Sequence, residues 1–284
     1  MKRFIAVILM MIVMTSCVVS NIEIEQTEEY KIPYATDVDG QLVPVHENVE
    51  ESTLDPKLFY LDENERMQYN SVAHEMFTGI DVSIFQGDIN WNEVAADGID
   101  FVMLRAGFRG YGIRGIMQVD ENLKKNYEGA KQAGLKVGVY FYSQAISEAE
   151  AIEEAHFLLN AIKGMDIDFP VAYDWEYVDN DAARTNNMTS FEITNCANAF
   201  CNEIIKYGYQ VIIYFNCEIG YFEYDLNKLQ NFDFWLAEYN EYPTFIYDYK
   251  MWQYTDKGNV NGIDGNVDIN ISLVDFSKSA NSVG

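Results

Sequence analysis

Short apolar runs alternate with amphipathic stretches along the chain from residue 77 onward. The apolar runs predict buried strands at residues 79–83, 101–105, 137–142, 169–174 and 211–215. The stretches between them predict helices at residues 91–96, 120–133, 147–162 and 189–207. Two capping-box pairs, Ser147 with Glu150 and Thr189 with Glu192, mark the starts of the last two helices. This order is typical of parallel strands joined by crossover helices.

Helical patterns become rare after residue 215. Three further strands are predicted at residues 234–237, 249–253 and 267–270, with loops or turns between them. Five strand–helix units followed by three strands indicate an eight-stranded α/β barrel that lacks its later helices. In such a barrel the functional side chains gather at the carboxyl ends of the strands.

The fourth predicted strand ends in two carboxylates, Asp174 and Glu176, with Trp175 between them. Because side chains alternate along a strand, Asp174 and Glu176 point to one face and Trp175 to the other. Two like charges at the end of an apolar strand are costly unless one carboxyl takes up a proton or both serve a positive centre. The pair is therefore either the acid of a hydrolase or a strand end that continues into a solvated loop.

Two more acidic residues belong to predicted strands of the same barrel. Asp81 lies in the first strand and Asp268 in the last one. If the barrel closes, both converge with Asp174 and Glu176 on one mouth. The pattern thus predicts a pocket formed by four carboxylates from three strands.

Composition and charge narrow the class of protein. The chain has 284 residues, of which 49% are hydrophobic, which suits one large globular domain. Its formal net charge of −26 excludes long-range attraction to nucleic acid or to anionic membrane surfaces. His46, His74 and His156 lack ligand spacing, so we expect no metal site and no cofactor. We also expect the chain to act as a monomer.

The first residues have the pattern of an export signal. Positive charge at Lys2 and Arg3 precedes an apolar run, residues 4–14, which is too short for a comfortable membrane span. The run leads into residues 14–17, which resemble a bacterial lipobox. We favour a lipidated Cys17 over a simple cleaved signal, so the expected location is the bacterial cell surface, with the lipid as the only membrane contact.

The residues after Cys17 differ in character from the barrel. Residues 18–72 are rich in acidic side chains and have little sustained periodicity, which predicts a solvated spacer, although the apolar patch at residues 58–61 could dock on the domain. The expected organisation is therefore a signal peptide with lipobox at residues 1–17, an acidic spacer at 18–72 and a catalytic barrel at 73–284.

Three cysteines follow the lipobox. An odd number argues against a complete disulfide framework in an exported protein. Cys196 and Cys201 diverge around the axis of a predicted helix, whereas a pairing of Cys201 with Cys217 stays open. We expect all three to pack in the core.

A series of short motifs runs through the barrel. The motifs occupy residues 79–83, 86–91, 98–102, 105–107, 133–141, 174–176, 235–237, 251–254 and 265–270. Taken in this order, they resemble glycoside hydrolase family 25, the lysozymes that cut peptidoglycan as N-acetylmuramidases. The resemblance covers residues 77 to about 275.

The resemblance implies a flattened TIM-like (β/α)5(β)3 barrel that cleaves the β-1,4 bond between N-acetylmuramic acid and N-acetylglucosamine. It implies that Glu176 is the general acid, that Asp174 is its partner, and that Asp81 and Asp268 are the other acids of the pocket. Tyr140 matches an aromatic residue that lines the family's sugar cleft. The implied partners are the glycan strands of peptidoglycan, in the cell's own wall or a foreign one.

Other side chains are candidates for substrate contact. Aromatic rings that either stack on sugars or pack in the core are Tyr140, Tyr142, Trp235, Tyr239, Trp252 and Tyr254. Arg105 either binds a carboxylate of the peptide stem or, as we expect, neutralises the acids of the pocket.

Two questions of chemistry stay open at the level of sequence. Asp174 either stabilises positive charge or orients the substrate's 2-acetamido group for attack on the anomeric carbon, and we hypothesise retention with acetamide participation. Rival functions are a non-catalytic, surface-anchored glycan-binding protein and a chitinase-type glycosidase.

Overall fold

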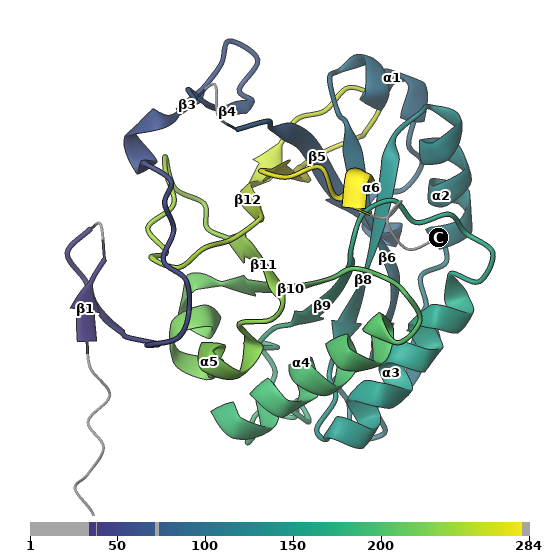
Figure 1. The fold of residues 1–284 in the computed structure, drawn as a ribbon. Helices are drawn as coiled ribbons and strands as arrows, with labels where there is room; N and C mark the ends of the chain where they lie inside the picture. The colour runs from purple at the N-terminus through teal and green to yellow at the C-terminus, as the bar shows by residue number, and fades with distance from the viewer. Residues whose placement is uncertain (1–33, 38, 72–73, 280–284) are drawn as a thin grey trace, which may run out of the picture. The chain divides into compact units, whose positions relative to one another are not determined.

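The computed structural model describes residues 34–37, 39–71 and 74–279. Eight strands form a closed ring, because β5 pairs both with β6 and with the last strand, β13 (Figure 1). In ring order the strands are β5 (Phe77–Val82), β13 (Val267–Ser272), β12 (Met251–Gly258), β11 (Asp233–Ala237), β10 (Val211–Asn216), β9 (Val171–Trp175), β8 (Lys136–Ser143) and β6 (Phe101–Arg109). The predicted eight-stranded α/β barrel is confirmed.

Helices flank the earlier strands and nearly vanish after β10. They are α1 (Trp91–Ala96), α2 (Leu123–Gln132), α3 (Glu148–Ala161), α4 (Ser190–Ile205), α5 (Leu226–Leu229) and α6 (Phe276–Ser279), with short 3-10 helices η1 (Pro56–Leu58) and η2 (Ile84–Gln86) and a π-helix η3 (Ile219–Glu223). Thr189 and Glu192 make both bonds of the predicted capping box. At Ser147 the side chain accepts the Glu150 N–H, but the Glu150 carboxylate accepts the N–H of Ile146, so that box is only half formed.

The last strand runs against the others. β12 and β13 form an antiparallel pair, and β13 is also antiparallel to β5, whereas the other neighbours in the ring are parallel. A short strand, β7 (Met117–Val119), adds an antiparallel edge to β6. Because of its reversed direction, β13 brings its first residues to the end of the barrel where β5 finishes, and Asp268 lies opposite Asp81.

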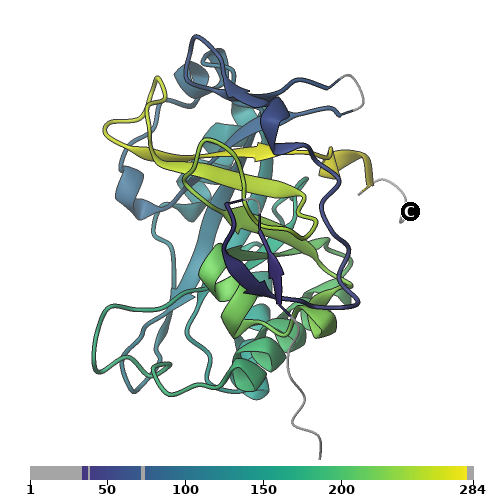
Figure 2. The same cartoon turned by 90° about the vertical axis from the view of Figure 1, so that its left-hand side faces the viewer.

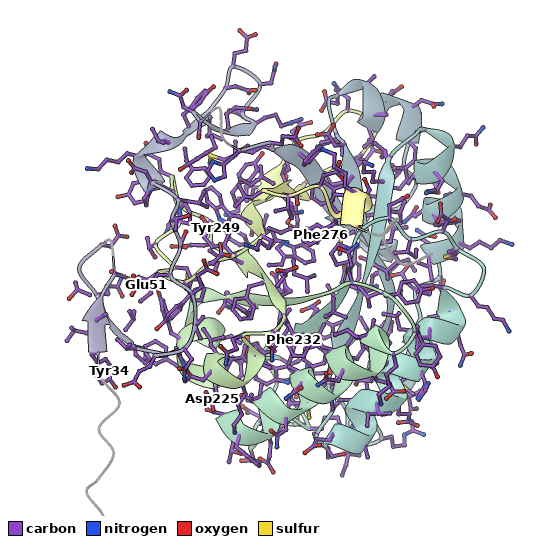
Figure 3. The ribbon with its side chains drawn as sticks, in the orientation of Figure 1. Tyr34, Glu51, Asp225, Phe232, Tyr249 and Phe276 are labelled. Atoms are coloured by element: carbon purple, nitrogen blue, oxygen red, sulfur yellow. The ribbon has the colours of Figure 1, made fainter. Side chains whose placement is uncertain are left out.

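Alternation along the strands builds two separate cores. Inward side chains fill the barrel with one apolar cluster, in which the Phe101 and Phe169 rings stack with centroids 4.5 Å apart. Gly79 has no side chain, and a Cβ there would come within 2.3 Å of the Phe101 ring. Phe276 of α6 packs against Phe169 and closes the cluster; its position is labelled in Figure 3.

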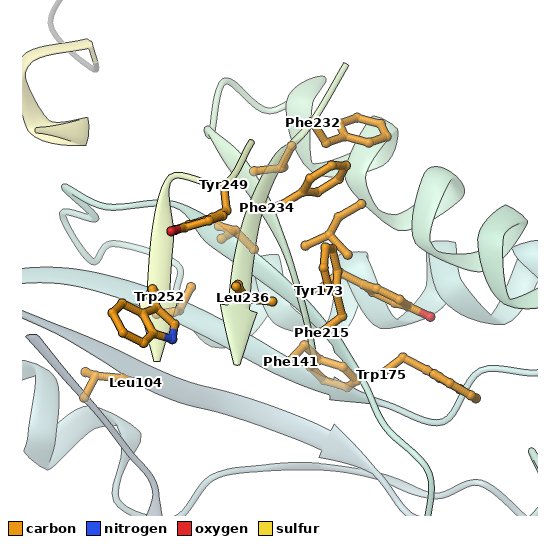
Figure 4. Packing of buried hydrophobic residues seen from close by; sticks show 14 of the residues in the cluster. Leu104, Phe141, Tyr173, Trp175, Phe215, Phe232, Phe234, Leu236, Tyr249 and Trp252 are labelled. Carbon is orange, nitrogen blue, oxygen red and sulfur yellow. The ribbon is translucent and has the colours of Figure 1, made fainter. Parts of the chain in front are cut away.

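Outward side chains form the larger core against the helices. Figure 4 shows part of this cluster, with Tyr173, Phe215 and Phe234 projecting from neighbouring strands. The Phe215 and Phe234 rings pack edge to face at 5.2 Å. On β9, Ala172 therefore faces the barrel interior, while Tyr173 and Trp175 face the helices.

The segment before the barrel differs from the predicted solvated spacer in its described part. It contains β1 (Tyr34–Thr36), β2 (Leu42–Pro44), β3 (Phe59–Leu61) and β4 (Met67–Tyr69). Phe59 and Met67 are buried, and the Phe59 ring packs edge to face on Trp252 of β12 at 5.1 Å. Figure 2 shows this purple and blue segment lying across the side of the barrel formed by the later strands. It covers strands that have no long helix of their own.

Other expectations from the sequence have different outcomes. The three cysteines of the described residues are free thiols, so the pairing of Cys201 with Cys217 is excluded. Cys196 and Cys201 are buried in the core as expected, whereas Cys217 is only partly buried against it. No helix in the described part of the chain is both long and apolar enough to cross a membrane. The export signal and Cys17 lie outside the described residues.

Candidate active site

Four carboxylates line one pocket of about 290 Å³. Asp174 is the inward residue near the end of β9, and Glu176 follows it by two positions, so both face the pocket as the alternation predicts. Asp81 comes from the end of β5 and Asp268 from the start of β13. The structure thus brings together the four acids that the sequence singled out.

Asp174 and Glu176 share a side-chain hydrogen bond. Burial raises the pKa of Asp174 well above its usual range, and the charges of Glu176 and Asp81 raise it further. Burial also raises the pKa of Glu176, but the hydrogen bond from Asp174 lowers it. Both carboxyls thus hold a proton more firmly than an exposed carboxyl does, and the pKa of Asp174, the more deeply buried one, is raised the more strongly.

A second carboxyl pair lies across the pocket. Burial, followed by the charge of Asp81, raises the pKa of Asp268 to about 8. Asp81 is also desolvated, which raises its pKa, but hydrogen bonds from Asn270, Gln253 and Asp268 lower it. The hydrogen bonds at Asp81 thus favour its ionised form, whereas those at Asp268 do not.

Two buried amides hold Asp81, and the sequence analysis did not single them out. Asn270 Nδ2 and Gln253 Nε2 each donate to Asp81 Oδ2 at 2.8 Å. Both amides are almost completely buried, on β13 and β12. A polar residue at an inward position of an otherwise apolar strand was the available signal, since such a group needs a partner.

Most of the predicted aromatic candidates lie where they were expected. Tyr140, Tyr142, Trp235 and Tyr239 line the pocket, together with Tyr214, which the sequence analysis did not name. Tyr239 is 52% exposed at the mouth, whereas Tyr214 packs edge to face on Trp235 at 4.9 Å.

Trp252 is the exception among these candidates. Its neighbours Met251 and Gln253 face the barrel interior, so alternation turns Trp252 outward, where it is fully buried against Phe59. Tyr254 shares this face and packs with Trp252. The prediction that Trp252 contacts the substrate is therefore wrong.

Arg105 lies at the rim of the pocket, between the rings of Phe85 and Phe108 at 5.0 and 5.2 Å. Its guanidinium bonds the Asp120 carboxylate through both Nε and Nη2 at 2.8 Å. Its positive charge lowers the pKa of Asp174, but less than burial and the neighbouring acids raise it. Arg105 thus offsets the acidity of the pocket only in part, and its ion pair is with Asp120.

The donor set of the pocket suits acid–base chemistry. Among residues 34–37, 39–71 and 74–279, no group of three His, Cys, Asp or Glu side chains is arranged to hold a metal ion. Glycoside hydrolysis uses two carboxyl groups that flank the scissile bond, and this pocket offers such groups beside aromatic side chains.

Comparisons with known proteins agree with this chemistry. An autolytic lysozyme of Clostridium acetobutylicum is 31% identical over 193 residues, which are 67% of this chain and 54% of that protein. The chain thus spans about half the length of that relative.

Solved structures share the fold. The modular autolysin LytC of Streptococcus pneumoniae, solved with a synthetic peptidoglycan ligand, is 25% identical with a TM-score of 0.58, over 84% of this chain and 56% of LytC. A family 25 glycosyl hydrolase of Bacillus anthracis superposes with a TM-score of 0.59 at 20% identity, over 78% of this chain and 99% of that one. Residues 80–263 match the family described as glycosyl hydrolases family 25, and the chain therefore belongs to glycosyl hydrolase family 25.

Proposed function

We propose that this protein is a lysozyme that hydrolyses the β-1,4 bond between N-acetylmuramic acid and N-acetylglucosamine in peptidoglycan. The observation that carries the proposal is the pairing of Asp174 with Glu176, two proton-sharing carboxyls in a pocket with Asp81 and Asp268. Two lines of similarity support it: the family match, and relatives named as an autolytic lysozyme and a peptidoglycan-bound autolysin. The four acids speak against a non-catalytic glycan-binding protein.

Glu176 is the proposed general acid. It is the less deeply buried member of the pair, so it is the carboxyl that a glycosidic oxygen in the pocket can reach. In the free enzyme we place the shared proton on Asp174, whose pKa is raised the more strongly. Transfer along their hydrogen bond would leave Asp174 ionised and Glu176 neutral, ready to protonate the leaving oxygen.

Binding of the substrate's acetamide group would favour that proton transfer. Asp174 Oδ1 is buried and has no hydrogen-bond partner among the described residues. An acetamide N–H that donates to Oδ1 would favour the ionised form of Asp174 and so push the proton to Glu176. The same contact would orient the acetamide oxygen for attack on the anomeric carbon, which gives retention of configuration.

The test is digestion of purified peptidoglycan by wild type and by Glu176→Gln, with mass spectrometry of the fragments. Loss of a general acid is expected to lower the rate by about 10²- to 10⁴-fold. Glu128→Gln on the exposed face of α2 is the matched control and should keep full activity. Binding without cleavage by both wild type and Glu176→Gln would instead support a glycan-binding protein.

The stereochemical proposal has its own test. An NMR time course of the wild-type reaction follows the anomer that is released first. Retention is expected from acetamide participation, and an inverted first product would rule that route out.

We further propose that the enzyme acts as a monomer, anchored at the bacterial surface through lipid on Cys17, where it remodels or degrades cell walls. The sequence pattern at residues 1–17 supports this proposal. Incorporation of labelled fatty acid by wild type, and none by Cys17→Ala, is the expected result. Equal incorporation by both would contradict the anchor.

A further inference from the structure

Asp81 is the centre of a network of hydrogen bonds that joins five other side chains. Trp235 Nε1 donates to Asn270 Oδ1 at 2.8 Å, and Asn270 Nδ2 donates to Asp81 Oδ2. On the other side, the hydroxyls of Tyr239 and Tyr214 donate to Gln253 Oε1 at 2.7 and 3.0 Å, and Gln253 Nε2 donates to Asp81 Oδ2.

The chemistry of these groups determines which of them donate and which accept the hydrogen bonds of the network. An indole N–H can only donate, so the amide atom that faces Trp235 must be the oxygen of Asn270. The NH₂ of Asn270 is thereby turned toward Asp81. Gln253 Oε1 accepts from two tyrosine hydroxyls, which can donate or accept, and its NH₂ is likewise turned toward Asp81. Asp81 Oδ2 consequently faces two N–H donors and acts as an acceptor of both.

Two donors at one carboxylate oxygen favour the ionised form of that carboxyl. Asp268 faces the same group from β13, and their hydrogen bond raises the pKa of Asp268 while it lowers that of Asp81. The proton of the pair therefore goes to Asp268. The other charged or titratable groups that act on this region are Asp174, Glu176, Asp256, Arg105, Tyr140, Tyr214 and Tyr239.

The charge on Asp81 also reaches the proposed acid. It raises the pKa of both Asp174 and Glu176. An ionised Asp81 thus helps Asp174 and Glu176 to keep their shared proton as the pH rises. Any change that neutralises Asp81 should let Glu176 lose its proton at a lower pH.

We propose that Asn270 and Gln253 are positioning residues that hold Asp81 ionised and place the neighbouring proton on Asp268, and that Trp235 sets this arrangement by orienting Asn270. The effect on turnover rests on the proposed lysozyme function. The effect on protonation does not, because the network exists in the free protein. Trp235 then does more than offer a surface for sugar rings, because its N–H determines which atom of the Asn270 amide faces Asp81.

The decisive variant is Trp235→Phe, which keeps an aromatic ring beside Tyr214 and removes the N–H donor together with the rest of the five-membered ring. The matched control is Trp252→Phe, which also removes a buried indole N–H, the one that donates to the Glu238 carbonyl outside the pocket. For Trp235→Phe we expect the basic limb of the kcat/KM profile to move to lower pH by about half a unit. We expect no such movement for Trp252→Phe. Tyr239→Phe, at an exposed position that tolerates change, should move the limb in the same direction by less.

A titration without substrate separates this inference from the proposed function. Carboxyl NMR of the protein labelled at aspartate should show one carboxyl, absent in Asp268→Asn, that stays neutral near pH 7 and ionises at lower pH in Trp235→Phe. An Asp268 that is ionised at pH 6 in wild type, or a titration and pH profile unchanged in Trp235→Phe, would overturn the inference. If the titration behaves as expected in a protein that cuts no peptidoglycan, the lysozyme proposal fails and the assignment of protons stands.

Discussion

Phe59→Ala tests whether the segment before the barrel is part of the folded domain. The side chain is 7% exposed and packs on Trp252, with Tyr69 on its other side at a ring distance of 4.6 Å. Truncating a buried phenylalanine removes its apolar area from the core and leaves a cavity, at a cost of about 3 to 5 kcal/mol. Because Phe59 lies at the edge of the core, we take the lower end of that range.

A loss of about 3 kcal/mol should lower the Tm by about 6 to 12 °C in a domain of this size. Differential scanning calorimetry measures the shift directly. Tyr60→Ala is the matched control, because Tyr60 is the next residue of β3 and is 51% exposed. The Tm of this variant should be close to that of the wild type. Equal melting of Phe59→Ala and Tyr60→Ala would refute the view that this segment stabilises the barrel.

Three further predictions concern the pocket and the core. Burial raises the pKa of Asp174, Glu176 and Asp268 in the folded state above that of an unfolded carboxyl, which is about 4, so stability should fall as pH rises from about 4 to 8. Asp268→Asn should flatten this slope in Tm measured against pH; a wild-type Tm that rises over the interval would contradict the sign. Trp252→Phe should lower the Tm and leave KM for peptidoglycan unchanged, whereas a raised KM would return Trp252 to the substrate site. Brief alkylation of the native protein should leave Cys196 and Cys201 unmodified in peptide mass spectra, because both thiols are buried and burial raises the pKa of Cys196 to about 12; rapid labelling would contradict their place in the core.

The sequence alone predicted the barrel and its acids for clear physical reasons. Strands buried on both faces have continuous apolar runs, and helices between them have capped starts, so the order of elements was readable. Because side chains alternate between the two faces of a strand, Asp174 and Glu176 were expected on one face. The sequence pattern could not show that β13 is antiparallel to its neighbours. Because of this direction, Asp268 at the start of β13 lies opposite Asp81 at the end of β5.

Other features depend on contacts between distant parts of the chain. The apolar patch at residues 58–61 indicated a possible contact with the domain, but not its partner: Phe59 packs on Trp252, almost two hundred residues away. Trp252 itself was assigned to the pocket because of its residue type. Side chains alternate along β12, however, so Trp252 faces away from the side on which Gln253 lies. Asn270 and Gln253 show their role only through the direction of their hydrogen bonds, which a sequence does not display.

Reducing-end analysis of the digestion products tests the central claim most directly. Purified peptidoglycan is digested with wild-type protein, the products are reduced with borodeuteride, and the labelled sugar alcohols are identified by mass spectrometry. A muramidase places N-acetylmuramic acid at every new reducing end, so we predict labelled muramitol and its absence from the Glu176→Gln digest. Labelled glucosaminitol, or the same muramitol yield from Glu176→Gln, would contradict the account.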